Sequence, residues 1–136
     1  MPKVFTSETQ KIGEIGENIV VKFLMKHGFS IKDRNYTKKW GELDIVAEKA
    51  NKIHFIEVKS VSRDNIKSVS YETLDSYKPE DNMHPWKLKR MSRTIQTYLL
   101  SKNIDEEKEW QADLFVVFLD IKNKKAKIKK VEDIIL

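Results

Sequence analysis

Two carboxylates in one short segment are spaced so that they converge. Residues 40–60 read WGELDIVAEKANKIHFIEVKS, and the alternation of apolar and polar residues predicts two strands joined by a turn. A turn centred between Ala50 and Asn51 places Asp44 on the first strand directly opposite Glu57 on the second. Opposed residues have Cβ atoms about 4.5–5.5 Å apart, so two carboxylates there need a proton, a cation or full solvation. A divalent cation also supplies chemistry, because Mg2+ prefers carboxylate and water oxygens.

The same register places Glu42 opposite Lys59, on the face that carries the two carboxylates. Lys59 could there activate a water molecule or stabilise charge on a scissile phosphate. Glu42 is interpreted as a salt-bridge partner of Lys59 or an outer contact rather than a metal ligand; an ordinary solvent-facing cross-strand pair is the alternative. Apolar residues on the charged face favour a covered cleft, and these are Val46, Ile53 and Phe55. The opposite face is expected to carry Leu43, Ile45, Ala47, Ile56 and Val58.

A helix is predicted before the hairpin, over the sequence SETQKIGEIGENIVVKFLMKHGF. Ser7 and Gln10 have capping-box spacing at its start, and Gly28 stands where a left-handed cap ends a helix. The following FSIKDRNY is a strand candidate. The apolar stripe expected on the helix is Ile12, Ile15, Ile19 and Phe23.

A second helix and one or two strands are predicted after a long polar connection over residues 61–83. HPWKLKRMSRTIQTYLLSK restarts a helix with Pro85 in its first turn. ADLFVVFLD has the length of a buried strand, and KIKKVEDIIL predicts a last one. The order of helix, three strands, helix and one or two strands indicates a small α/β or α+β fold. The core stripe of the second helix is Leu88, Met91, Ile95, Tyr98 and Leu99.

The composition indicates one globular domain over residues 1–136, with a lysine-rich strand or tail from about residue 121. There are 26 Lys and Arg against 21 Asp and Glu, a net charge of +5 that is compatible with a polyanionic partner. The absence of cysteine excludes disulfides, thiolate metal sites and cysteine nucleophiles. No stretch has the apolar length of a signal peptide or membrane span, and a cytoplasmic location is expected.

The motif GELDIV, followed 13 residues after its aspartate by EVK, resembles the PD-(D/E)XK nuclease superfamily. A longer ordered string resembles the YraN-type (UPF0102) family of predicted endonucleases, from about Ile12 to Leu119. The string runs through GEIGENIVVKFLMKHGF, DRNY, GELDIVAE, FIEVKS, KLKRMSRTIQTYL and ADLFVVF. The chain is also similar to the archaeal Holliday-junction resolvases, which share an acid on the first helix.

The resemblance implies a restriction-endonuclease-like fold with an α-β-β-β-α-β core and a mixed central sheet. It implies that Asp44 and Glu57 bind Mg2+ or Mn2+ and that Lys59 is the catalytic lysine. Glu17 matches the acid on the first helix that helps to bind metal, and the backbone carbonyl of Val58 is implied as an extra ligand. The resolvases further imply branched DNA as the substrate and a homodimer as the acting form.

Basic residues outside the hairpin are candidates for phosphate contacts, which give affinity without reading sequence. The alternative is an ordinary solvated face. Trp40 either stacks on a base or belongs to the core, and the lysine-rich C-terminus is interpreted as a solubilising edge strand rather than a nucleic-acid tail. A capping or hydrogen-bonding role is expected for Asp113, and structural roles for the histidines. The predicted phosphate contacts are Arg34, Lys38, Lys39, Lys87, Lys89, Arg90 and Arg93.

Three readings of the function follow from these residues. The first is a metal-dependent endonuclease that hydrolyses DNA phosphodiester bonds. The second is a catalytically silent nucleic-acid-binding module with a nuclease-like fold. The third is a scaffold whose hairpin charges are structural, with no metal and no salt-dependent affinity for DNA.

Overall fold

The computed structural model describes residues 8–62 and 84–136. Within them the order is helix, three strands, helix and two strands, which confirms the predicted α/β architecture. The expected contribution of Ser7 to a capping box, and most of the connection over residues 61–83, lie outside the described residues. The elements are α1 (Glu8–Lys26), β1 (Ser30–Lys38), β2 (Gly41–Lys49), β3 (Lys52–Ser62), α3 (Pro85–Ser101), β4 (Glu109–Asp120) and β5 (Lys125–Val131).

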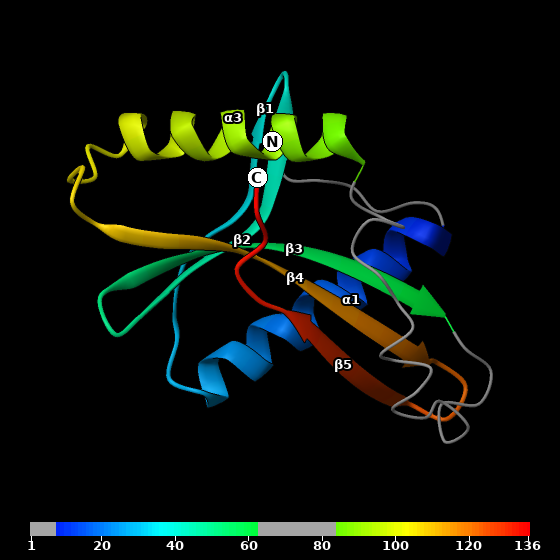
Figure 1. The fold of residues 1–136 in the computed structure, drawn as a ribbon. Coiled ribbons are helices and arrows are strands. Elements are labelled where there is room, and N and C mark those ends of the chain that lie inside the picture. The colour runs from blue at the N-terminus through cyan, green and yellow to red at the C-terminus, as the bar shows by residue number, and fades with distance from the viewer. Residues whose placement is uncertain (1–7, 63–83) are drawn as a thin grey trace.

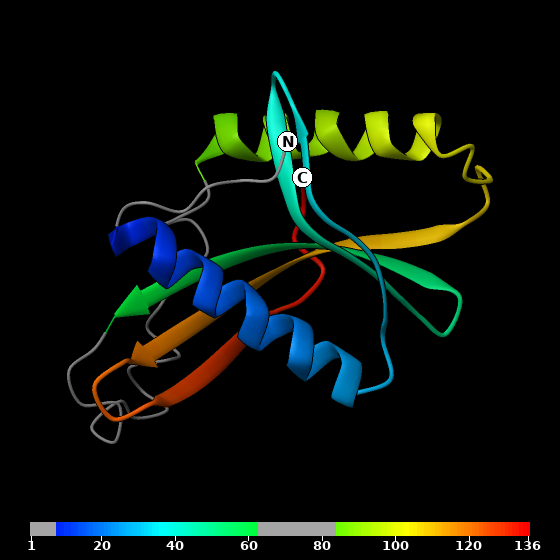
Figure 2. The ribbon, with the colours of Figure 1, turned by 180° about the vertical axis from the view of Figure 1, so that it is seen from behind.

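The described strands form one five-stranded sheet in the order β1-β2-β3-β4-β5. β3 and β4 are parallel, and the other neighbours are antiparallel, so the sheet is mixed as predicted. The two helices pack on opposite faces: α3 crosses in front of the β1–β2 ribbon in Figure 1, and α1 lies in front of the sheet in the reverse view of Figure 2. This is the arrangement expected of a restriction-endonuclease-like core. No described helix has the length and apolar character needed to span a bilayer.

Strand β4 supplies core residues to both faces, because its alternating side chains are apolar on either side. Leu114, Val116 and Phe118 pack in the cluster under α3, and Phe115 and Val117 pack in the cluster under α1. A strand buried on both faces reads as a continuous apolar run, which is why LFVVFL predicted it. The α3-side cluster also contains Met91, Ile95 and Tyr98, with Leu88 and Leu99 packed against it, as predicted.

Helix α1 ends as predicted, and most of its predicted apolar stripe packs on the sheet. Gly28 has a φ of +87° and its N–H donates to the Met25 carbonyl, while the N–H of Phe29 donates to the Leu24 carbonyl, a Schellman termination. The fully buried apolar residues are Val20 and Leu24, whereas Ile15 is 40% exposed. Ile12, Ile19 and Phe23 of the predicted stripe pack against the core cluster on this side of the sheet, whereas Ile15 does not, because the helix turns Gly16 and Glu17 toward the sheet.

The β2–β3 hairpin has the predicted register over its paired length. Ala50 and Asn51 form its turn, with φ of 50° and 62°, and the ladder runs from Lys49–Lys52 to Ile45–Ile56. Beyond Ile45 and Ile56 the sheet forks. β2 stays paired with β1 as far as Gly41, and β3 stays paired with β4 as far as Ser62. In Figure 1 the β1–β2 ribbon rises toward α3 while β3 continues beside β4.

The fork overturns one predicted pairing. Glu42 pairs with Thr37 of β1, and Lys59 pairs with Val116 of β4, so the two are not cross-strand partners. It also moves Leu43, which was expected on the face of Ile45 and Ala47 but packs in the α3-side cluster. The cause is the bend of the β1–β2 ribbon onto α3.

The ribbon approaches α3 through Gly41. A Cβ at this position would clash with Thr94 Oγ1 and would lie 3.3 Å from the carbonyl oxygen of Arg90. Only glycine allows this approach without displacing the helix. Gly41 therefore determines where the β1–β2 ribbon contacts α3.

Candidate active site

Asp44 and Glu57 are the first residues past the last β2–β3 pair, so they stand at the point where the sheet forks. The Oδ2 atom of Asp44 accepts a hydrogen bond of 2.8 Å from the backbone N–H of Val58. In an extended strand the N–H and C=O of one residue point to the same edge. The Val58 carbonyl therefore faces the fork as well, although its role as a metal ligand stays a prediction.

The two carboxyl groups converge, although Asp44 and Glu57 stand one position beyond the last pair of the ladder in which they were predicted to be opposed. Burial raises the pKa of Asp44 well above its ordinary value of 3.8, and the negative charge of Glu57 raises this pKa further. The charge of Glu17 and a side-chain hydrogen bond with Glu57 act in the same direction, while the Val58 N–H lowers the pKa. Burial and the negative charges of Glu57 and Glu17 thus disfavour the ionisation of Asp44.

Glu17 reaches this site from α1. Its side chain is buried, at 8% exposure, on the face that the helix turns toward the sheet. The close approach of α1 depends on Gly16, where a Cβ would clash with Ser60 Oγ of β3. The prediction that an acid of the first helix joins the two hairpin carboxylates agrees with this placement.

Asn35 connects the acids and was missed by the sequence analysis. With its amide nitrogen toward the carboxylates, it donates to Oε1 of Glu17 at 3.2 Å and to Oε1 of Glu42 at 3.0 Å. It lies in β1 between the partners of Ile45 and Leu43, and its φ of 53° is left-handed. Asparagine tolerates this conformation better than most residues, which is the signal available within the DRNY string.

Glu42 and Lys59 are not opposed across the hairpin, because the β2–β3 ladder ends at Ile45–Ile56. Glu42 accepts from the Asn35 amide instead, and this places it at the outer border of the acidic site. Lys59 is exposed on β3, two residues past Glu57. The catalytic role predicted for Lys59 stays a prediction.

Lys87 of α3 compensates part of the negative charge. Its Nζ atom lies 2.9 Å from Oε1 of Glu57, whose side chain is 16% exposed. Lys87 was predicted as a phosphate contact, and here it faces a carboxylate at the first turn of the helix. The pair links the fork to the beginning of α3.

A cavity of about 390 Å3 opens between the fork and the first turns of α3. Its walls combine acids from the sheet with aromatic and basic residues from the helix. They are Gly41, Glu42, Asp44, Glu57, His84, Trp86, Lys87, Arg90 and Met91.

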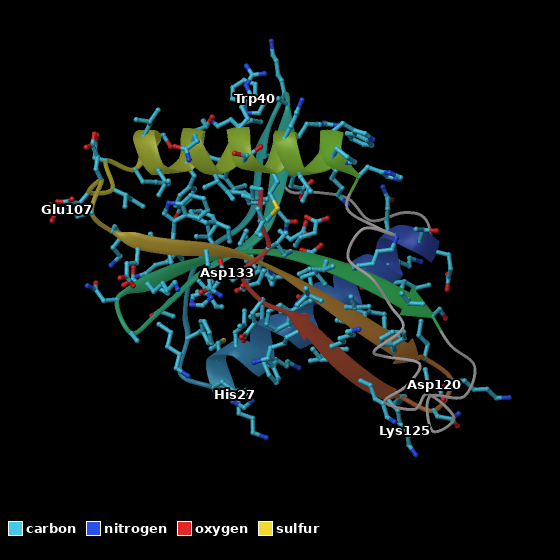
Figure 3. The ribbon with its side chains drawn as sticks, in the orientation of Figure 1. His27, Trp40, Glu107, Asp120, Lys125 and Asp133 are labelled. Atoms are coloured by element: carbon cyan, nitrogen blue, oxygen red, sulfur yellow. The ribbon has the colours of Figure 1, made fainter. Side chains whose placement is uncertain are left out.

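The remaining predicted phosphate contacts divide into two groups. Arg90 and Arg93 gather at the tip of the β1–β2 ribbon: Arg90 Nε donates to the Trp40 carbonyl at 2.7 Å, and the Arg93 guanidinium lies 4.2 Å from the centroid of the Trp40 ring. Figure 3 shows Trp40 at this tip, beside α3. Lys38 lies over the Tyr36 ring, and Lys39 and Lys89 are exposed nearby on the ribbon and α3. Arg34 is elsewhere and donates to Asn18 of α1 at 2.8 Å.

The donor set fits a divalent cation shared by two carboxylates and water. Among the described residues no three His, Cys, Asp or Glu side chains are arranged as a complete ligand group. Mg2+ usually takes only one or two carboxylates from a protein and keeps several waters. Asp44 and Glu57, with the neighbouring charge of Glu17, satisfy that smaller requirement, and a cation would relieve the repulsion that raises the pKa of Asp44.

Asp113 lies apart from this site and has the hydrogen-bonding role that was predicted. It is 2% exposed and faces His54 Nδ1 at 2.8 Å. It also accepts from the Gln111 amide at 2.7 Å and from the backbone N–H of Asp133 at 2.9 Å. These bonds tie the segment after β5 to β4.

Comparison with known proteins places the chain among relatives of similar length. Residues 16–119 match the profile described as uncharacterised protein family UPF0102. A UPF0102 protein of Campylobacter hominis is 37% identical over 126 residues, which are 93% of this chain and 95% of that protein. A UPF0102 protein of Flavobacterium psychrophilum is 31% identical over 93% of this chain and 95% of its own length. One from Campylobacter jejuni is 35% identical over 80% of this chain and 85% of its own.

Proposed function

The chain belongs to the uncharacterised protein family UPF0102, and from this premise we propose that it is a metal-dependent endonuclease that hydrolyses DNA phosphodiester bonds. One observation carries the proposal. The carboxyl groups of Asp44 and Glu57 meet at the fork of the sheet, in a cavity whose other wall is aromatic and basic. Paired acids beside cationic side chains suit a phosphodiester, because the acids hold a cation and the bases hold the anionic backbone.

Asp44 and Glu57 would hold Mg2+ or Mn2+, with the Val58 carbonyl and Glu17 as further oxygen donors. When bound, the cation would polarise the scissile phosphate and lower the pKa of a coordinated water. Val58 orients Asp44 through its N–H, and Asn35 restrains Glu17.

Two basic side chains would assist the carboxylates. Lys59 is exposed on β3 and would reach the phosphate from the solvent side. Lys87 would exchange its contact with Glu57 for one with the nucleic acid once that carboxylate binds the cation. By analogy with the resolvases, we propose branched DNA as the substrate and a homodimer as the acting form.

A silent nucleic-acid-binding module is the second candidate, and one contact favours it. The Glu57–Lys87 ion pair at 2.9 Å already neutralises one of the two central acids, which lowers the need for a cation. This candidate predicts binding to DNA without cleavage in any metal.

The test compares purified full-length variants on labelled duplex, single-stranded, flap and four-way-junction DNA, with Mg2+, Mn2+ or EDTA. Asp44→Asn, Glu57→Gln and Lys59→Ala should each lower the cleavage rate by about 100-fold or more, a loss typical of removing one charge-stabilising group. Glu106→Gln and Lys26→Ala are matched controls, because both residues are exposed and outside the cavity. Binding without metal-dependent cleavage would establish the silent module. A wild-type protein that neither binds nor cuts would leave the scaffold reading.

A further inference from the structure

Trp86 is an exposed aromatic residue in the wall of the acidic cavity. Its side chain is 57% exposed, and among the exposed large hydrophobic residues of the described segments it is the one aromatic. It lines the same cavity as Asp44 and Glu57. A single exposed apolar side chain is ordinary on a protein surface, but this one lines the cavity that holds the two carboxylates, where a bound ligand would cover it.

Two neighbouring side chains, Arg90 and His84, restrain the tryptophan ring. The guanidinium of Arg90, one helical turn further along α3, lies 5.5 Å from the ring centroid. Arg90 is itself fixed by its 2.7 Å bond to the Trp40 carbonyl. The His84 ring is nearly parallel to Trp86, with an interplanar angle of 6° and a centroid distance of 6.4 Å. A ring that is already oriented loses little conformational freedom when a second ring stacks on it.

On the α3 wall of the cavity the charged side chains beside the ring are basic, and they favour an anionic partner. Lys87 and Arg90 share the cavity wall with Trp86, and Arg93 lies further along the same helix. The first turn of α3 contains no acidic residue. A partner that offers both a flat aromatic face and negative charge is a nucleotide. In a continuous duplex the base faces are covered by their neighbours, so an unpaired base is the one that can stack.

We propose that Trp86 stacks on an unpaired base next to the phosphate that lies at Asp44 and Glu57, so the preferred substrate contains a single-stranded segment. This inference rests on the proposed function. It narrows the substrate from DNA in general to strands with at least one unpaired nucleotide at the cut.

The test measures binding in EDTA, where metal-dependent cleavage is absent. The full-length protein is titrated with a labelled single strand and with the blunt duplex of the same sequence. Trp86→Ala should weaken single-strand binding by about 10-fold or more, as expected for the removal of one base stack. Duplex binding should change by less than about 3-fold, because its base faces are already covered. Trp86→Phe, which keeps an aromatic face, should restore most of the affinity.

Two controls separate stacking from unfolding and from charge. Leu100→Ala removes another exposed hydrophobic residue of α3, 78% exposed, and should leave both affinities unchanged. Because Trp86 is uncharged, the slope of log affinity against log salt should stay the same in Trp86→Ala.

Equal losses on single strand and duplex, or no loss on either, would overturn the inference. If the wild type cuts DNA and Trp86→Ala keeps the preference for single strands, the stacking is refuted and the proposed nuclease activity is not. A protein that binds single strands through Trp86 but cuts nothing would refute the nuclease and leave the stacking. Failure of the wild type to bind either strand form would refute both.

Discussion

At the scale of single residues, Asp44 joins the structure to the proposed chemistry. Its Oδ2 atom accepts from Val58 while Glu57 and Glu17 oppose its ionisation. A buried carboxylate beside other acids destabilises the folded chain when it is charged. A bound cation would remove most of that repulsion. The same side chain therefore weakens the fold without metal and supplies the affinity for metal.

The raised pKa of Asp44 predicts how stability depends on pH. Because the folded state holds this proton more tightly than the unfolded state, the free energy of unfolding should fall as pH rises from 3.8 through the raised pKa. Asp44→Asn lacks this proton, so in EDTA its stability relative to the wild type should increase over the same range. Urea unfolding at a series of pH values measures the difference. Parallel curves for the two proteins would contradict the prediction.

Adding Mn2+ should stabilise the wild type and not the variant.

The sequence predicted the convergence of Asp44 and Glu57 but not the group that links Glu17 to them. The two hairpin acids follow from register, since the turn at Ala50 and Asn51 fixes every pair up to Ile45–Ile56. Asn35 follows from no spacing rule. Its left-handed φ and the approach of α1 arise only when β1, β2 and the helix are packed together.

At the scale of elements, the fork depends on two glycines that allow close approach. Gly16 lets α1 approach Ser60 of β3, and Gly41 lets the β1–β2 ribbon approach Thr94 of α3. The sequence predicted the helices, the strands and their order. It could not predict that the β2–β3 ladder ends at Ile45, because the alternation of residues allows residues 41–44 to stay paired with β3. The packing of the β1–β2 ribbon against α3 determines where the two strands separate.

Gly16→Ala tests the approach that delivers Glu17. The new methyl group would clash with Ser60 Oγ, and overpacking of this kind costs about 1–3 kcal/mol. Ser60 Oγ is buried with no hydrogen-bond partner in the described structure, so Ser60→Gly removes the clash without breaking a bond. Thermal or urea unfolding of both single variants and the double variant gives the coupling. We expect the double variant to recover most of the loss, and strictly additive effects would show that the two residues do not limit the approach of α1.

At the scale of the whole molecule, positive charge gathers in two places that differ in their setting. One surrounds the tip of the β1–β2 ribbon and α3, near the cavity, and includes Lys39 and Arg93. The other belongs to β5, which is the edge strand beside β4 in the described sheet, and to the turn before it. Figure 3 shows Lys125 and Asp120 at that turn, far along the sheet from Trp40. In the sequence both clusters are runs of basic residues. Only the fold shows that one lies near the cavity and the other does not.

The two clusters should differ in their effect on the salt dependence of DNA binding. Replacing Lys39 and Arg93 by alanine should make the slope of log affinity against log salt shallower, by about 0.9 for each phosphate that is no longer neutralised. Replacing Lys122 and Lys125 removes the same charge from the other cluster and should leave the slope unchanged. Fluorescence anisotropy on duplex DNA at several salt concentrations measures both. Equal slopes for the two double variants would argue against a defined DNA-binding surface.

The hydrogen bond from Val58 to Asp44 has a consequence for how molecules meet one another. Where β2 departs, no strand of the described residues pairs with that edge of β3, and unpaired strand edges recruit strands from other copies. The aspartate closes this edge by accepting the N–H that a visiting strand would bind. Asp44→Ala would leave this N–H without its acceptor, so we expect this variant to self-associate and to yield more insoluble protein. Asp44→Asn keeps an acceptor oxygen and is therefore the better substitution for studying the chemistry.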